Sequence, residues 1–125
     1  EVVLPFFHTL RPLVLTYALE EILAEKMRSI LQRGKARDYY DVWRLLKEKK
    51  TALDLSLTRS LLEQKCRHKG LEVDDAQALL TPQHLEEAAP YWERDLARQV
   101  APQSLPDWAA AIAELADSLE QFFRE

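Results

Sequence analysis

Apolar residues recur every three or four positions along most of this chain, which is the spacing of one buried helix face. The pattern is clearest where Leu19, Leu23, Met27 and Ile30 follow one another with charged residues between them. Serine and threonine often begin helices, and glycine often ends them. We therefore predict helices from the cap Thr16 to Gly34, and over residues 36–49, 57–68, 82–98 and 107–123, with a short helical turn within 74–80.

Proline and glycine divide the chain. Its two glycines, Gly34 and Gly70, each follow a predicted helix, so both should be helix stops, and Pro90 should kink or split the helix over 82–98. Residues 1–16 differ, because two prolines interrupt short runs of apolar residues that are typical of extended chain. Two short strands are marginal alone, so we expect them to join a sheet upstream of residue 1.

The composition agrees with one mainly helical domain of 125 residues, 47% hydrophobic and 30% charged. The predicted fold class is all-α, with about five helices and a short extended N-terminal segment. A single cysteine, Cys66, excludes an internal disulfide. The sequence contains no apolar run near the roughly 20 residues that span a bilayer, so we expect a cytoplasmic protein with no membrane contact.

Charge is unevenly distributed, which the net charge of -4 conceals. Residues 26–50 contain nine basic and three acidic residues, whereas residues 71–125 contain three basic and twelve acidic ones. A basic segment within an acidic protein favours an anionic partner such as a phosphate or a nucleic acid. The alternative is an ordinary solvated helix surface.

Two charged residues interrupt the apolar faces of consecutive predicted helices. Lys26 falls among the apolar residues of the first, and Asp38 falls among those of the second, with Asp41 one turn further on. Taken singly, Lys26 could extend its ammonium to water, and the two carboxylates could offset the helix dipole. Taken together, Lys26 and Asp38 should converge across one groove, because the link between their helices is very short.

Such a groove would suit phosphate chemistry. Arg33, Lys35 and Arg37 would lie at its mouth and hold phosphoryl oxygens, while a carboxylate orients or deprotonates a nucleophile. A buried structural salt bridge predicts the same positions. No histidine or cysteine spacing indicates a metal site, so no metal ligand is predicted among these residues.

The same region carries a family resemblance. Residues 17–33, YALEEILAEKMRSILQR, continued by residues 34–43, GKARDYYDVW, resemble the signature of the AbiEii/AbiGii abortive-infection nucleotidyltransferase toxins. That signature is a helix with a lysine and an arginine, followed by an arginine–aspartate pair and a second aspartate. The resemblance implies that Lys26 and Asp38 are catalytic. We assign nucleotide or phosphate binding to Arg33, Lys35, Arg37 and Asp41.

The implied function is that of the C-terminal helical part of a nucleotidyltransferase. It would be the toxin of a bacterial toxin–antitoxin or abortive-infection system, and it would move a nucleoside monophosphate from a nucleoside triphosphate to an acceptor such as RNA. The implied partners are the triphosphate with Mg²⁺, the RNA and an antitoxin protein. The alternative is a non-catalytic helical module that binds proteins, in which Lys26 and Asp38 form a structural pair.

One feature departs from the family pattern. The family takes its metal-binding carboxylates from a Gly-Ser turn followed by an Asp-x-Asp strand, and neither occurs in these 125 residues. We therefore expect Mg²⁺ and triphosphate to be held by the parent protein, and the isolated chain to be inactive. Residues 1–16 would be a remnant of the nucleotidyltransferase sheet, and residues 17–125 would form the helical C-terminal domain.

Overall fold

Helices account for most of the chain in a computed structural model that describes residues 5–49, 52–73, 75–96 and 105–124, with side chains from residue 19 onward. They are α1 (Pro5–Gln32), α2 (Ala36–Glu48), α3 (Leu55–His68), the 3₁₀ helix η2 (Ala76–Ala78), α4 (Pro82–Ala88), α5 (Tyr91–Leu96) and α6 (Trp108–Arg124). No strand occurs in the described ranges, which confirms the predicted all-α fold class. None of the described helices is long and apolar enough to span a bilayer.

The start of α1 differs from the prediction. We expected an extended segment over residues 1–16 and a cap at Thr16, but residues 5–16 are helical, and residues 1–4 lie outside the described part. Pro5 is tolerated because the first residue of a helix donates no intrahelical bond. Pro12 has no backbone N–H, so the helix loses one backbone hydrogen bond there. The rest of α1 is already a helix, and nearly every further residue that extends it adds another such bond. The proposed domain division at residue 16 stays a prediction.

The other predicted boundaries lie close to those observed. Gly34 and Gly70 adopt the left-handed backbone conformation, with φ of 55° and 70°, so both are helix stops as predicted. The helix expected over residues 82–98 is split at Pro90 into α4 and α5. The turn expected within 74–80 is η2.

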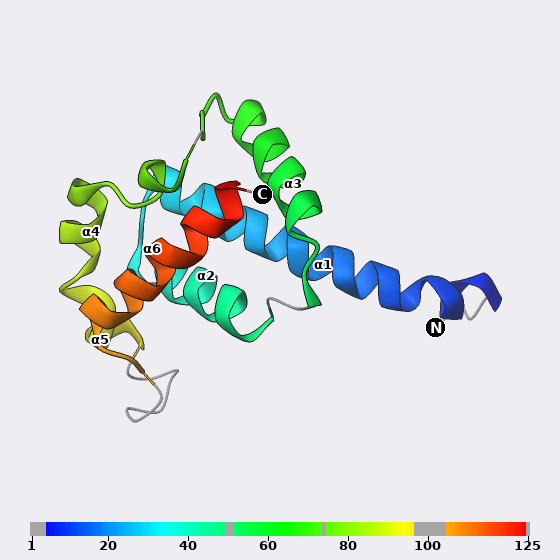
Figure 1. The fold of residues 1–125 in the computed structure, drawn as a ribbon, viewed down its shortest axis with the longest axis horizontal. Coiled ribbons are helices and arrows are strands. Elements are labelled where there is room, and N and C mark those ends of the chain that lie inside the picture. The colour runs from blue at the N-terminus through cyan, green and yellow to red at the C-terminus, as the bar shows by residue number, and fades with distance from the viewer. Residues whose placement is uncertain (1–4, 50–51, 74, 97–104, 125) are drawn as a thin grey trace.

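One hydrophobic core joins these elements. The second half of α1 packs against α3 and α2, and α2 in turn packs against α6 and α5 (Figure 1). An aromatic group fills the space between α2, α5 and α6, where the Trp108 ring meets Trp92 and Tyr39 edge to face at 5.0 Å and 5.7 Å. The Trp92 indole N–H also donates to the Pro106 carbonyl at 2.8 Å. The core therefore fixes how α5 lies against the start of α2.

A buried carboxylate attaches α3 to α1. Glu20, 0% exposed, accepts a hydrogen bond from the backbone N–H of Asp54, whose own carboxylate caps α3 through the N–H of Leu57 at 3.0 Å. Lys65 of α3 then pairs with Glu21 of α1 at 2.7 Å, and this hydrogen bond raises the pKa of the lysine. These contacts hold α1 against α3 on the N-terminal side of Lys26.

Candidate functional site

The candidate site lies where the end of α1 meets the start of α2. The chain reverses between them at Gly34, and the N–H groups of Arg33 and Gly34 both donate to the Ser29 carbonyl, which closes the end of α1. A Cβ atom on Gly34 would lie 2.8 Å from Cγ of His84, so α4 covers the link directly. This tight, covered link brings Lys26 and Asp38 together.

Asp38 is almost completely buried, at 1% exposure, and is surrounded by positive charge. The Arg33 guanidinium forms a forked interaction with it, from Nε to Oδ2 at 3.1 Å and from a terminal nitrogen to Oδ1 at 3.3 Å. The Lys26 ammonium lies 4.0 Å from Oδ1. Forked arginine–carboxylate pairs fix geometry as well as charge, so Arg33 holds the Asp38 carboxylate in one orientation.

Lys26 joins the buried carboxylate to a more exposed one. Its ammonium lies 2.9 Å from Oδ2 of Asp41, and the two side chains are 30% and 31% exposed. Asp38 and Asp41 are three residues apart on α2, so their side chains share one helix face. The predicted convergence of Lys26 and Asp38 is therefore confirmed, and the group of Lys26, Arg33, Asp38 and Asp41, here termed the charged cluster, reaches solvent on the Lys26 side.

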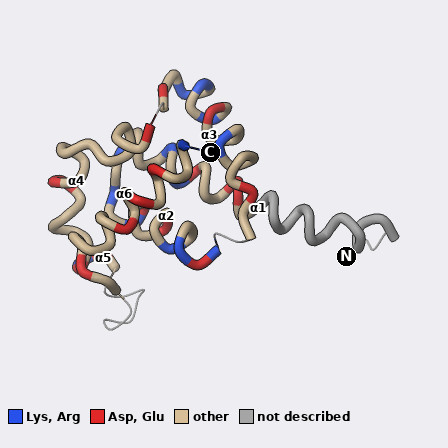
Figure 2. Tube along the Cα trace, viewed as in Figure 1, with Lys and Arg blue, Asp and Glu red and all other residues tan. Residues whose placement is uncertain are grey.

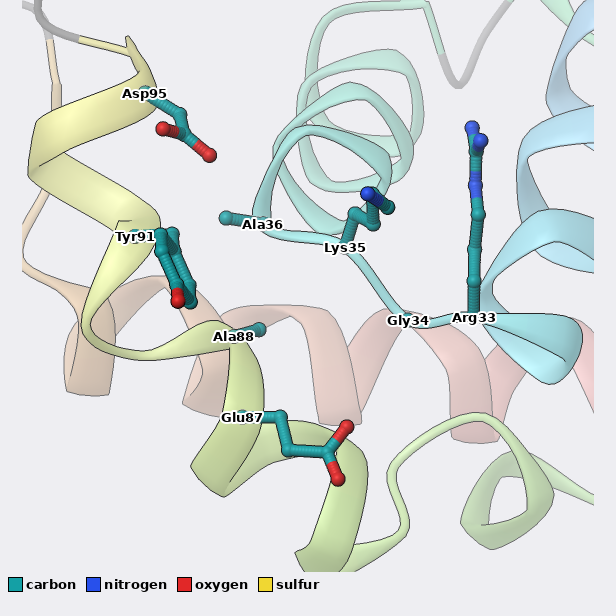
Figure 3. A pocket seen from close by; sticks show the side chains of 8 residues that line it. All are labelled: Arg33, Gly34, Lys35, Ala36, Glu87, Ala88, Tyr91 and Asp95. Atoms are coloured by element: carbon teal, nitrogen blue, oxygen red, sulfur yellow. The ribbon is translucent and has the colours of Figure 1, made fainter.

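The remaining predicted residues lie elsewhere. Lys35 and Arg37 are both exposed at the start of α2, and Lys35 lines a neighbouring cleft of about 370 Å³. Residues 33–36 form one side of this cleft, and Glu87, Ala88, Tyr91 and Asp95 form the other (Figure 3). Arg33 is common to the charged cluster and the cleft.

The acidic side of this cleft was not predicted. Glu87 of α4 and Asp95 of α5 line the cleft together with Arg33 and Lys35. Figure 2 shows acidic positions on both α4 and α5. The sequence contains one signal, because Tyr91 and Asp95 are four residues apart and lie on the same face of any helix. The segment that this face packs against depends on the direction that the chain takes after Pro90. The sequence alone does not predict that direction.

Tyr39, next to Asp38, was also missed. It is fully buried, and its hydroxyl donates to the Leu79 carbonyl at 3.4 Å. Burial, together with the nearby Asp38 charge, raises the pKa of Tyr39 to about 12. Its ring and hydroxyl anchor the first turn of α2, and thereby the position of Asp38.

The charged cluster is not suited to hold Mg²⁺. Both oxygens of Asp38 face Arg33 or Lys26, and Asp41 already pairs with Lys26, so a divalent cation here would meet two positive side chains. No group of three metal-ligating side chains occurs in the part of the chain that the structure describes. Both carboxylates of the charged cluster thus already have cationic side chains as partners.

A comparison with protein families identifies the chain's relationship. A family described as the nucleotidyl transferase AbiEii toxin, of type IV toxin–antitoxin systems, matches residues 2–114. The chain belongs to this AbiEii toxin family. The match extends well beyond residues 17–43 and confirms the resemblance seen there. No curated protein and no solved structure matches the chain significantly.

Proposed function

We propose that Lys26 and Asp38 form part of a nucleotidyltransferase active site in this AbiEii family member, with Arg33 and Asp41 as their charged partners. The observation that carries the proposal is their convergence from two consecutive helices, with Lys26 lying 4.0 Å from Asp38 and 2.9 Å from Asp41. The Lys26 ammonium is partly exposed and can contact a phosphoryl oxygen. Asp41, equally exposed, is the partner that a phosphate would replace.

The proposed reaction transfers a nucleoside monophosphate from a nucleoside triphosphate to a hydroxyl of RNA. The RNA oxygen bonds to the α-phosphorus, the bond to pyrophosphate breaks, and the hydroxyl proton passes to the Asp38 carboxylate. Lys26 stabilises the charge that develops on the phosphoryl oxygens. Arg33 is 55% exposed, so it can turn from Asp38 toward a phosphate group of the bound RNA and leave that carboxylate able to accept the proton.

The wider setting follows from the family. A type IV toxin acts beside an antitoxin, so we propose a protein antitoxin as the partner of the whole protein. Triphosphates and RNA are cytoplasmic, and we place the activity there. Mg²⁺ would be held outside the charged cluster, which does not suit it.

The test compares variants of the complete protein in a bacterial growth assay. Lys26→Ala should abolish growth arrest while the melting temperature changes little, because the Lys26 side chain already reaches water. Asp38→Asn keeps the size of the side chain and should also abolish arrest. Arg44→Ala is the matched control, because it removes an exposed pair on α2, between Arg44 and Glu48 at 2.9 Å, whose acidic partner is not a member of the charged cluster. Arrest by a folded Lys26→Ala protein contradicts the proposal.

A second candidate is a non-catalytic helical module that binds another protein. The deep burial of Asp38 and its forked contact with Arg33 favour this candidate, because buried ion pairs also occur as purely structural features. In that case Lys26→Ala should leave growth arrest unchanged, and Asp38→Asn should act only by lowering the melting temperature. The two candidates therefore differ in the folded Lys26→Ala protein.

A further inference from the structure

We infer that the cleft between residues 33–36 and the α4–α5 segment binds one nucleotide of the acceptor RNA strand, with its phosphate at Lys35 and Arg33, its base on Tyr91 and the base's amino group at Asp95. The inference rests on the proposed function, because it supplies the second substrate of that reaction. It concerns residues outside the charged cluster, apart from Arg33.

The size and position of the cleft fit this role. Its volume is about 370 Å³, within the range of small-molecule sites and large enough for one nucleotide. Arg33 lines the cleft and also contacts Asp38 at 3.1 Å, so a ligand in the cleft lies next to the proposed general base. The hydroxyl of the acceptor strand must reach the Asp38 carboxylate, which is the proposed general base. The triphosphate would instead contact Lys26 on the solvent side.

Tyr91 supplies a surface for a base. It is 43% exposed, one of two large hydrophobic residues that are notably exposed among the described side chains. Its ring projects from α5 toward the start of α2 (Figure 3). The Arg94 guanidinium lies 5.3 Å from the ring centroid and restrains the ring. Exposed aromatic rings beside cations are the usual stacking platforms of single-stranded nucleic acid sites.

The charges on the two sides of the cleft select the ligand. Arg33 and Lys35 lie on one side, and Glu87 and Asp95 lie on the other. A ligand that is anionic throughout would be repelled by the acidic side, and a cation would be repelled by the basic side. The arrangement therefore suits a molecule with a phosphate at one end and hydrogen-bond donors at the other, as in a nucleotide whose base carries an amino group.

Asp95 is the residue that distinguishes one nucleobase from another. It lies one helical turn after Tyr91, so a base stacked on the tyrosine presents its edge to this carboxylate. A carboxylate accepts hydrogen bonds from the amino group of cytosine, whereas uracil carries an oxygen at the same position and is repelled. The cleft should thus prefer cytidine to uridine, two nucleotides of almost equal size.

The test measures binding of two RNA trimers, CCC and UUU, to the complete protein by fluorescence anisotropy. The expected result is roughly tenfold tighter binding of CCC. Asp95→Ala should remove this preference, and Tyr91→Ala should weaken binding of both trimers at least roughly fivefold, whereas Tyr91→Phe should bind as the unaltered protein does. Lys35→Ala should weaken both trimers equally and reduce the salt dependence.

Glu93→Ala is the control for Asp95→Ala, because Glu93 is an exposed acid on the same helix that does not line the cleft. It should leave both dissociation constants unchanged. The inference is overturned if neither trimer binds, or if Tyr91→Ala and Asp95→Ala bind both trimers as the unaltered protein does. Both side chains are exposed, so these variants should fold, and a melting curve verifies this.

The inference and the proposed function fail in different ways. If transfer requires Lys26 but Tyr91→Ala leaves the KM for RNA unchanged, the cleft inference is wrong and the proposed function stands. If CCC binds in a Tyr91-dependent manner but the protein transfers no nucleotide to RNA, the cleft is an RNA site and the proposed function is wrong. A raised KM for RNA with an unchanged KM for the triphosphate supports both.

Discussion

The charged cluster and the cleft beside it use the same residue types in opposite environments. In the cluster, Asp38 is 1% exposed and both its oxygens face protein cations. In the cleft, Asp95 and Tyr91 lie exposed on a helix of six residues. Charges that the protein itself neutralises hold a fixed geometry, whereas exposed charges facing one another across a cleft suit a ligand. The difference predicts where a substitution affects stability and where it affects binding.

The link between the two regions should give the largest effect on stability. Gly34→Ala places a Cβ 2.8 Å from the His84 ring and forces alanine into a left-handed backbone, so we expect a loss of about 3 kcal/mol in unfolding free energy. Gly70→Ala is the control, because its φ is 70° but no atom lies within 4 Å of the added Cβ. It should cost about 1 kcal/mol in the same urea titration. Equal losses would show that His84 does not hold the link.

Substitutions of Asp38 in the charged cluster and of Asp95 in the cleft should differ in their effect on the unfolding free energy. Asp38→Ala removes a buried carboxylate and leaves Lys26 and Arg33 facing each other, and both can partly rehydrate, so we expect a loss of about 2 kcal/mol. Asp95→Ala removes an exposed side chain and should change the unfolding free energy by less than about 0.5 kcal/mol. Urea unfolding measures both. Similar losses for the two variants would show that the charged cluster and the cleft do not differ in their contribution to stability.

The fold could be predicted more completely than the site. Apolar spacing predicted the helices from residue 36 onward because a buried face recurs with the helical period, and both glycine stops follow from the same local chemistry. The prediction of an extended segment was wrong, because residues 5–16 continue α1, and lengthening an existing helix needs no new nucleus. The prolines and short apolar runs of this segment did not indicate that continuation.

Within the site, predictability depends on how near the residues lie in sequence. Lys26 and Asp38 interrupt apolar faces on either side of a three-residue link, so their meeting was predictable. The forked contact of Arg33 and the pair between Lys26 and Asp41 were not predicted. Tyr91 and Asp95 come from a segment some fifty residues later in the chain. Their place opposite Lys35 is set by the split at Pro90 and by packing against α2, which are long-range effects.

Tyr39 gives a smaller effect that depends on pH. Its folded pKa of about 12 exceeds the ordinary value of 10, so the contribution of the neutral phenol is complete below pH 10. Between pH 10 and about 12 the unfolded chain loses this proton and the folded chain keeps it, so stability falls by about 1.4 kcal/mol per pH unit.

Tyr39→Phe should remove that fall. At neutral pH it should cost only about 0.5 to 1 kcal/mol, because the lost hydrogen bond to Leu79 is long, at 3.4 Å. Chemical unfolding at pH 8 and at pH 11 measures both quantities. If the unfolding free energy of the variant still falls with pH at the same rate, groups other than Tyr39 cause the loss of stability in alkali. Tyr39 would then contribute through packing only.

The central claim is that the charged cluster serves nucleotide transfer. The most direct measurement is the rate at which the complete protein incorporates labelled nucleoside monophosphate into RNA, for unaltered, Lys26→Ala and Arg44→Ala proteins with matched melting curves. We predict a loss of roughly 100-fold or more for Lys26→Ala and no loss for Arg44→Ala. Transfer at an unaltered rate by folded Lys26→Ala protein would contradict the account.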